Sequence, residues 1–256
     1  MLLLVITLSI VAIWVALATY WRFFYFFRDP DRITPSGDNI VAPADGTIIY
    51  IRKVEQGKVP LAIKNRKEIE LEEIMKLDPD GKAIQRYIIG IFMTPLDVHV
   101  NRAPISGKIE QVLYFSGKNF SMARMTFNKI LGIKPLYSGT KHILQNERNI
   151  ILIKGEFPVY VVQIADSYVK KIENWVKEGE LVEKGQRIGI VKMGSQVDII
   201  LPLESLEIKV REGQHVTAGE TILAAWTAIS SQARLIQSKS TIYLSRTQGR
   251  KRTMRA

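Results

Sequence analysis

Residues 176–188 read VKEGELVEKGQRI, and residues 210–222 repeat this pattern as VREGQHVTAGETI. In both copies, glycine turns alternate with short runs that contain β-branched and apolar residues. Units of this kind turn corners in small twisted sheets and sandwiches. A second pair supports the same reading, because residues 42–48, APADGTI, are echoed by residues 103–109, APISGKI. The repeats therefore predict a mainly β fold with sandwich-like or barrel-like sheets.

Short apolar runs separated by glycine, proline and aspartate extend this β pattern over the rest of the body. The expected strands are Ile40–Val41, Gly46–Ile51, Tyr87–Met93, Lys108–Phe115, Ile150–Lys154, Val159–Ile164, Gln186–Lys192, Val197–Leu201 and Glu207–Val210. A helical period occurs only at Glu68–Leu77, which is expected to be the one helix of the body. The repeats resemble the half-motifs of lipoyl and biotinyl modules, a likeness of architecture that by itself says nothing about chemistry.

The N-terminal segment has the composition of a membrane-spanning helix. No charged residue occurs from Leu2 to Trp21, and about 20 apolar residues suffice to cross a bilayer. Aromatic residues crowd its C-terminal half, and Arg22, Arg28 and Arg32 follow. The positive-inside rule therefore predicts that the body faces the cytoplasm. A cleaved signal peptide is the alternative, with Ala16-Leu17-Ala18 as its cleavage site, but the basic segment that should precede its apolar core is missing.

Charge and composition narrow the classes of function. The chain has a formal net charge of +11, and seven of its basic residues lie in residues 229–256, which contain no acid. This stretch is either a solvated disordered tail or a segment for an anionic partner; a membrane is expected, and nucleic acid is not. Without cysteine and with three histidines, no metal site is expected. The chain thus divides into a membrane anchor at 1–27, a body at 28–228 and a basic tail at 229–256.

The tetrapeptide Met193-Gly194-Ser195-Gln196 lies between two strand-like runs and is the main candidate for chemistry. In a strained turn, the Ser195 hydroxyl can add to the carbonyl of Gly194 and convert the peptide bond to an ester. Elimination then splits the chain and leaves a pyruvoyl group, made from the serine, on the downstream fragment. Most Gly-Ser pairs are ordinary turns, so the surrounding sequence has to carry the argument.

Several segments, in a fixed order, surround this tetrapeptide with a specific pattern. They are Phe26–Pro30, Val41–Gly46, Phe92–Pro104, Asn146–Asn149, Val162–Ala165, Trp175–Gly189 and Met193–Asp198. Together they resemble the phosphatidylserine decarboxylase family, in the short form found in bacteria and archaea. The resemblance runs from about Phe23 to Leu223 and leaves the basic tail outside. For an archaeal source, the substrate implied is archaetidylserine, the ether-lipid counterpart.

The resemblance implies a proenzyme that cleaves itself at Gly194-Ser195. The products, residues 1–194 and 195–256, would stay together as a heterodimer, and a homo-oligomer is also expected. Ser195 would become the pyruvoyl cofactor, which forms a Schiff base with the serine headgroup and accepts the electrons released with carbon dioxide. The product would be the ethanolamine phospholipid. Because the substrate stays in the bilayer, a membrane anchor suits this reaction.

Three more residues are candidates for the site. His99 could activate Ser195 or relay a proton, because imidazole titrates near neutral pH; a buried structural histidine is the alternative. Asp45 matches the family's Ala-Asp-Gly turn and could orient a histidine or assist cleavage, although most Asp-Gly pairs are plain turns. Longer family members carry a second histidine where this chain has Arg102. This arginine is expected to bind the lipid phosphate or the substrate carboxylate, or else to be a surface residue.

Other polar residues near these motifs receive no catalytic role. Asp198 is expected to support the cleavage turn, while His142 and His215 fall outside the motifs. His215 lies in a repeat turn and is expected to be solvated.

Two non-enzymatic alternatives stay open at this point. A membrane anchor followed by lipoyl-like half-motifs also describes the periplasmic adaptors of export systems, but those need a long helical hairpin that this chain does not provide. A carrier domain modified on Lys192 would leave Ser195, His99 and the anchor unexplained. The sequence therefore favours a membrane-anchored, self-processing, pyruvoyl-dependent phospholipid decarboxylase, which is a carboxy-lyase.

Overall fold

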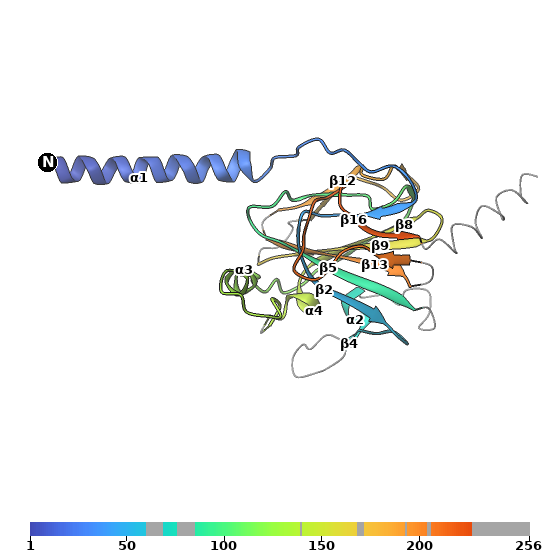
Figure 1. Ribbon diagram of the computed structural model, residues 1–256. Coiled ribbons are helices and arrows are strands. Elements are labelled where there is room, and N and C mark those ends of the chain that lie inside the picture. Colours follow the sequence, from blue (N-terminus) through green and yellow to red (C-terminus); the bar gives the residue numbers. More distant parts are fainter. Residues whose placement is uncertain are drawn as a thin grey trace, which may run out of the picture.

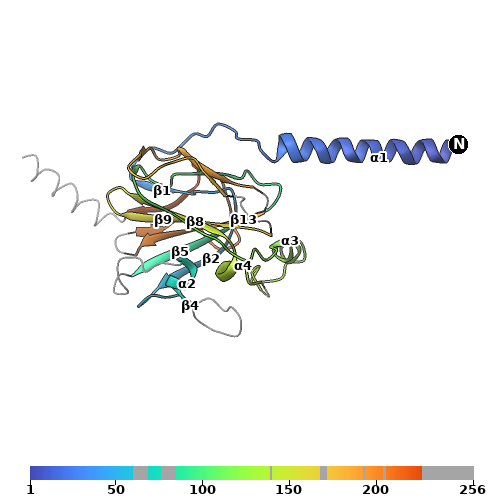
Figure 2. The same cartoon turned by 180° about the vertical axis from the view of Figure 1, so that it is seen from behind.

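The computed structural model describes residues 1–59, 69–75, 85–138, 140–167, 172–192, 194–203 and 206–226. The basic tail at 229–256 and Met193 of the tetrapeptide lie outside the described residues. A long N-terminal helix projects from one side of a β-rich body (Figure 1). The same arrangement is seen from behind in Figure 2.

The projecting helix consists of α1 (Leu2–Tyr20) and a π-helical turn, η1 (Trp21–Tyr25). Together they form 24 residues, and an 18-residue window within them has a mean hydropathy of 2.6 and contains no buried residue. At 1.5 Å per residue the helix is about 36 Å long, which exceeds the roughly 30 Å hydrocarbon core of a bilayer. By length and composition it is able to span a membrane.

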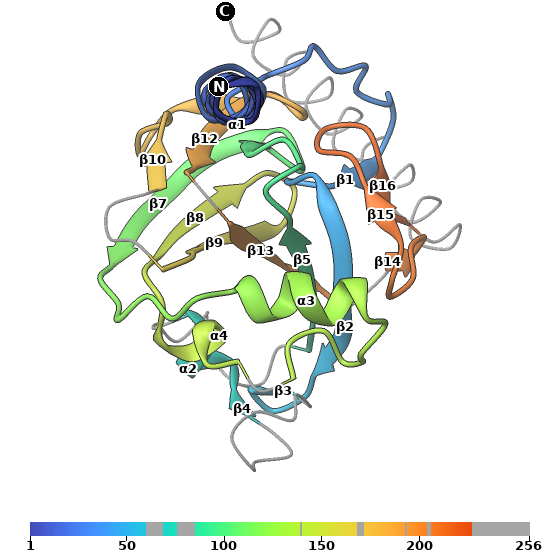
Figure 3. The same ribbon diagram turned by 90° about the vertical axis from the view of Figure 1, so that its left-hand side faces the viewer.

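The body is organised around an eight-stranded antiparallel sheet that curls into half a barrel (Figure 3). In spatial order its strands are β11 (Leu181–Val182), β7 (Gly107–Phe115), β8 (Arg148–Lys154), β9 (Pro158–Ala165), β13 (Ser195–Pro202), β5 (Arg86–Met93), β2 (Gly46–Val54) and β15 (His215–Val216). The central strand β13 is paired on both sides, with β9 and with β5. The residue that begins this central strand is Ser195.

Both faces of the main sheet are buried, because each supports a separate hydrophobic core. Along β13, Val197 and Ile199 face one core and Ile200 faces the other, as the two-residue period of a strand requires. The first core is covered by two three-stranded sheets, β1 (Asn39–Val41) with β16 (Ile222–Trp226) and β14 (Leu206–Ile208), and β10 (Ile172–Asn174) with β12 (Arg187–Val191) and β6 (Val100–Arg102). The second core is covered by three short helices, α2 (Leu71–Met75), α3 (Ala123–Ile130) and α4 (His142–Gln145). A small hairpin of β3 (Lys58–Val59) and β4 (Ile69–Glu70) precedes α2.

The sequence repeat is also a structural repeat. Each copy of the longer repeat binds one copy of the shorter repeat through the same pair of backbone hydrogen bonds. Residues 176–188 bind residues 103–109 from Gly179 N to Ile109 O (2.7 Å) and from Gly185 N to Ala103 O (2.8 Å). Residues 210–222 bind residues 42–48 from Gly213 N to Ile48 O (2.7 Å) and from Gly219 N to Ala42 O (2.8 Å). All four glycines have positive φ angles between 75° and 88°, which L side chains rarely adopt. The two copies contribute β11 and β15, the two edge strands of the main sheet. The repeat therefore closes both edges of the half-barrel.

The expected mainly β class is confirmed, and each expected strand overlaps a strand of the structure. The expectation of a single body helix was wrong. Within Glu68–Leu77 the structure describes α2, but α3 and α4 are helical as well. The α3 sequence buries only Met125 and Asn128, so it lacks the wide apolar stripe that identifies a helix from sequence.

Candidate active site

The Gly194-Ser195 bond lies where the main sheet begins its central strand. Ser195 is in register with Met93 on one side and with Ala165 on the other. Gly194 has a φ of +49°, and a Cβ at this position would collide with the carboxylate of Asp166. The Gly194 carbonyl accepts a hydrogen bond from the backbone N–H of Asp166 at 3.1 Å. The turn therefore requires glycine and holds the carbonyl of the candidate scissile bond against a backbone donor.

The Ser195 side chain is fully buried. Its hydroxyl lies 3.1 Å from Sδ of Met93, and a thioether is only a weak acceptor. No hydrogen bond joins Ser195 Oγ to His99 or to Asp45, all three of which are described. The serine hydroxyl is thus free of any strong partner that would hold it away from the neighbouring carbonyl.

His99 is buried beside the end of the N-terminal helix. Its ring lies 4.2 Å from the ring of Phe26, centroid to centroid, and its backbone carbonyl accepts a hydrogen bond from Val191, shortly before Gly194 in the chain. Nδ1 is 2.8 Å from the carbonyl of Asp97, so this nitrogen carries the proton, while the buried Nε2 has no hydrogen-bond partner. Burial lowers the pKa of His99 to about 4. At neutral pH the ring is therefore neutral, with an unoccupied lone pair on Nε2.

A second histidine, His215, binds the side chain of Asp97, whose backbone carbonyl binds His99. Nε2 of His215 lies 2.9 Å from Oδ1 of Asp97, and the other carboxylate oxygen of Asp97 accepts bonds from the N–H and the hydroxyl of Thr94, both at 2.7 Å. Burial acts to raise the pKa of Asp97, but the bonds from His215 and Thr94 outweigh it and leave the pKa below its usual value. His215 is half-exposed but not merely solvated as expected, because it helps to fix the Asp97 backbone that binds His99.

The other two predicted site residues, Asp45 and Arg102, each bind the linker between η1 and β1 (residues 26–38) as well as a backbone group of the body. Asp45 accepts from Ala218 N (2.7 Å) through one oxygen and from Arg32 (2.9 Å) through the other. Arg102 is buried and donates to the carboxylate of Asp29 (2.9 Å) and to two backbone carbonyls. These hydrogen bonds hold the linker against the body. They favour a structural role for both side chains over direct contact with a substrate.

A buried polar network, which the sequence did not reveal, lies on the face of β13 opposite to Ser195. Oε1 of Gln196 is 2.7 Å from Nε2 of His142, and the Gln196 amide donates to the hydroxyl of Tyr50 (2.8 Å) and to Asp198 (2.7 Å). The Tyr50 hydroxyl also donates to Asp198 at 2.8 Å. Burial raises the pKa of Asp198 to about 6 and lowers that of His142 to about 4. Asp198 and His142 therefore both help to hold β13, the strand that carries Ser195, while support of the cleavage turn by Asp198 stays a prediction.

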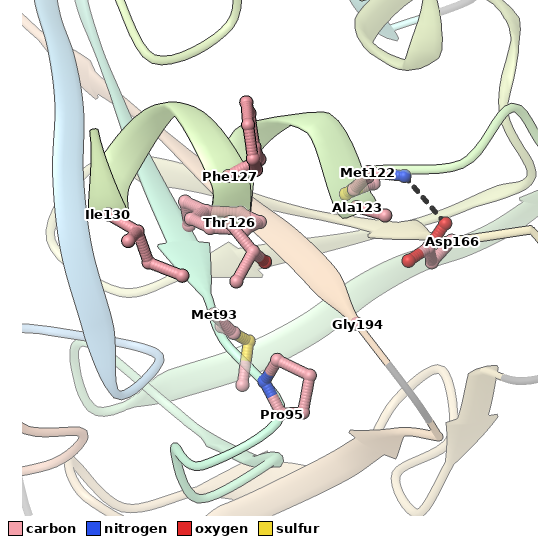
Figure 4. Close-up of a pocket in the computed structure, with 10 residues that line it drawn as sticks. Met93, Pro95, Met122, Ala123, Thr126, Phe127, Ile130, Asp166 and Gly194 are labelled. Atoms are coloured by element: carbon pink, nitrogen blue, oxygen red, sulfur yellow. Dashed lines mark hydrogen bonds between the residues drawn. The ribbon is translucent and has the colours of Figure 1, made fainter. Parts of the chain in front are cut away.

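A cleft of about 360 Å³ opens beside Gly194. It is lined by Phe92, Met93, Pro95, Met122, Ala123, Thr126, Phe127, Ile130, Asp166 and Gly194. Figure 4 shows Thr126 and Ile130 pointing from α3 toward Met93 and Pro95 on the other wall. The Asp166 carboxylate accepts from Met122 N at 2.7 Å, which joins the start of α3 to the cleavage turn. The cleft is mostly apolar, so it suits a molecule that carries hydrocarbon.

Asp166 is the most informative residue that sequence reasoning missed. It directly follows the segment Val162–Ala165 and has no signal of its own in the sequence, because its contact with Gly194 arises from the pairing of β9 with β13, which no local pattern encodes. Among the described residues, no group of three or more His, Cys, Asp or Glu side chains could hold a metal ion.

Comparisons with known proteins identify the family of the chain. The family model described as phosphatidylserine decarboxylase matches residues 20–224. A protein of Methanocaldococcus jannaschii named "Putative archaetidylserine decarboxylase proenzyme" is 41% identical over 202 residues, which cover 78% of this chain and 87% of the relative. A protein of Methanothermobacter thermautotrophicus with the same name is 40% identical and covers 78% of each chain.

A third relative comes from a bacterium. The phosphatidylserine decarboxylase proenzyme of Azorhizobium caulinodans is 38% identical over 219 residues, which cover 85% of this chain and 76% of the relative. The family match spans the linker, both sequence repeats and the cleavage turn, and it ends within β16 (Ile222–Trp226), the last described strand. The chain therefore belongs to the phosphatidylserine decarboxylase family, pyruvoyl-dependent carboxy-lyases that are made as self-cleaving proenzymes.

Proposed function

We propose that this chain cleaves itself between Gly194 and Ser195 and that Ser195 becomes the pyruvoyl group of a serine-phospholipid decarboxylase. The observation that carries the proposal is the geometry of the turn. The Gly194 carbonyl is held by the N–H of Asp166 at 3.1 Å, and the next residue is a buried serine with no strong hydrogen-bond partner.

The first step of cleavage places negative charge on the Gly194 carbonyl oxygen, when Oγ of Ser195 adds to the carbonyl carbon. The Asp166 N–H already donates to this oxygen and would stabilise the charge as it develops. A single such donor is worth about 100-fold to 1000-fold in rate. Collapse of the adduct breaks the peptide bond and forms the ester. Loss of a proton from the Ser195 Cα then expels the Gly194 carboxylate, and hydrolysis of the resulting dehydroalanine releases ammonia and leaves the ketone.

His99 is the proposed base for the serine proton. Its Nδ1–H is committed to the Asp97 carbonyl, so Nε2 offers a lone pair, and this nitrogen is buried without a partner. Phe26 packs against the ring and excludes water, which would otherwise compete for that lone pair. A direct catalytic role for Asp45 stays a prediction, as does substrate binding by Arg102, because the contacts of both support the linker.

The residues around the turn fit a pyruvoyl group. Ser195 directly follows Gly194, which lines the apolar cleft, and the strand that Ser195 begins is paired on both sides. Once formed, the group supplies an electron sink for the loss of carbon dioxide from a serine headgroup. The chain's own contribution is to hold that carbonyl at the base of the cleft, to keep water out with Phe92 and Met93, and to leave His99 Nε2 as a proton acceptor.

The substrate class follows from the family and the cleft. The headgroup is serine phosphate, and an ester lipid or an ether lipid would fit the apolar walls equally well. The N-terminal helix would anchor the enzyme at 1–27 with the body, 28–228, in the cytoplasm, because Arg22, Arg28 and Arg32 follow the span. The fragments 1–194 and 195–256 would remain paired through β13, and a homo-oligomer stays a prediction. The carrier alternative loses support, because the chain belongs to a family of decarboxylases.

The test is the intact mass of the purified full-length protein beside its Ser195→Ala variant, with Ser116→Ala as the matched control. We expect two fragments from the parent and from Ser116→Ala, with the smaller one beginning at residue 195 and blocked by pyruvoyl. Ser195→Ala should give one uncleaved chain. A single chain from folded parent protein, or cleavage at another bond, would refute the proposed site.

A further inference from the structure

An exposed apolar surface on and just after α3 begins at the rim of the cleft, which Phe127 and Ile130 line, and extends beyond it to Leu131 and Ile133. It consists of Phe127, Ile130, Leu131 and Ile133, whose side chains are 59%, 76%, 56% and 43% exposed. We call these four residues the α3 surface. Large apolar side chains gathered on one exposed surface usually mark a contact with a partner or a membrane.

We infer that the α3 surface inserts into the same lipid bilayer that the N-terminal helix enters, and that it thereby holds the mouth of the cleft on the membrane. This inference extends the proposed function, but it concerns where the protein contacts lipid and not the reaction. Three observations support the bilayer as the occupant.

The first observation is position. The N-terminal helix leaves the body on the side where α3 lies, which Figure 1 and Figure 2 both show. In Figure 3, where that helix points toward the viewer, α3 lies in front of the main sheet. A bilayer crossed by the helix therefore faces α3.

The second observation is continuity between the helix and α3. Phe26, directly after η1, is buried against His99, and Arg28 donates to the backbone carbonyl of Leu96 at 2.5 Å. Leu96 is 63% exposed and follows Pro95, which lines the cleft opposite α3. The N-terminal helix therefore ends next to Leu96, and Leu96 lies on the side of the cleft opposite the α3 surface. A lipid that entered the cleft would pass between two apolar rims.

The third observation is charge. No acidic residue occurs from Gln111 to Asn146, while this stretch contains five bases, Lys118, Arg124, Lys129, Lys134 and Lys141. All five are exposed. An apolar surface surrounded by basic residues is typical of segments that lie in the interface of a membrane with anionic lipids. A second copy of this chain, which has a positive net charge, is a less suitable occupant.

A single fluorescent probe tests this placement in the full chain. The protein has no cysteine, so Leu131→Cys can be labelled at one position with a polarity-sensitive dye. The matched control is Leu181→Cys in β11, another exposed leucine. Leu181 pairs with Lys108 near the start of β7. The α3 surface follows the other end of β7, which is Phe115.

Both labelled proteins are reconstituted into vesicles of phosphatidylcholine and phosphatidylglycerol, with and without brominated acyl chains. We expect the dye at 131 to emit at shorter wavelength and to be quenched by the brominated lipid, while the dye at 181 shows neither effect. Equal behaviour at the two positions would overturn the inference. A blue shift that lipid bromine does not quench would also overturn it, because protein and not lipid would then cover the surface. The readout needs no turnover, so its failure is separate from failure of the proposed reaction.

A substitution gives an independent test. Leu131 does not line the cleft, so Leu131→Asp should lower the decarboxylation rate on serine phospholipid in vesicles about tenfold, since burying one leucine is worth that much or more. The rate on a short-chain, water-soluble serine phospholipid should stay within about twofold of the parent, and Leu181→Asp should change neither rate. Equal losses on both substrates would mean a damaged fold or site and would overturn the inference.

Discussion

The two buried histidines make the stability of the uncleaved chain depend on pH. His99 and His142 are fully buried, and burial lowers the pKa of each from 6.5 to about 4. A group with a depressed pKa in the folded state favours folding above its unfolded pKa, and this contribution is lost as the pH falls toward the folded pKa. The loss for both residues thus begins near pH 6.5 and is complete near pH 4.

The magnitude follows from these pKa values. Between pH 7 and pH 5, each histidine lowers the free energy of unfolding by about 2 kcal/mol. Asp198 has the opposite sign, because burial raises its pKa from 3.8 to about 6. Its uptake of a proton returns about 1 kcal/mol over the same interval. The sum over the two histidines and Asp198 is a loss of about 2–3 kcal/mol, which for a body of this size corresponds to a fall in Tm of about 4–12 °C.

The assay is thermal unfolding of the detergent-solubilised Ser195→Ala variant at pH 7 and pH 5, so that one intact chain unfolds. In this background His142→Gln keeps a donor for Gln196 and should reduce the pH-dependent loss to under about 1 kcal/mol. His215→Gln is the matched control, because it leaves both buried histidines in place and should keep the full loss. If His142→Gln loses as much stability between pH 7 and pH 5 as its parent, burial of the His142 ring is not the source of the effect.

Three further changes test roles assigned to single residues. His99→Ala should slow self-cleavage about 100-fold, because it removes the proposed base; densitometry of the two fragments over time measures this, and cleavage at the parental rate would exclude that role. Asp166→Ala keeps the backbone donor but loses the carboxylate that fixes it, so cleavage should slow about tenfold, and an unchanged rate would mean that the backbone alone holds the turn. Arg102→Gln should lower the free energy of unfolding by about 1–3 kcal/mol through loss of its bond to Asp29; a higher KM with unchanged stability would instead restore Arg102 as a substrate ligand.

The β architecture was readable from sequence because it is encoded locally. Each copy of the repeat combines turn glycines with strand formers, and a positive φ leaves few alternatives to glycine at those turns. Main-sheet strands such as β5 and β9 are apolar on both faces, so their positions follow from composition alone. The Gly194-Ser195 pair was found for a different reason, since its chemistry requires those two residue types side by side.

The residues that hold the cleavage turn and β13 in place could not be predicted from the sequence, because their contacts depend on which strands are neighbours in the sheet. Asp166 reaches Gly194 only because β9 pairs with β13, and His142 reaches Gln196 across 54 residues of chain. For Arg102, in contrast, the sequence suggested a role that its contacts do not support. Its position next to a family motif suggested a ligand, but the structure engages it with Asp29 of the linker. A charged side chain near a motif can bind substrate or hold the motif in place, and only its contacts distinguish the two.

The place of the serine in the sheet explains why a cut in the chain can be tolerated. Ser195 is the first residue of β13, so cleavage before it removes no residue from the ladders that β13 forms with β9 and β5. The side chains that β13 gives to both cores follow the cut, and they keep the short fragment in place. The new terminus is therefore fixed at the end of a central strand. The upstream side ends at Gly194, which precedes the ladders of β13 and, among the described residues, is bonded through its carbonyl to the N–H of Asp166. Release of that side after cleavage would widen the cleft at the point where the reactive carbonyl is needed.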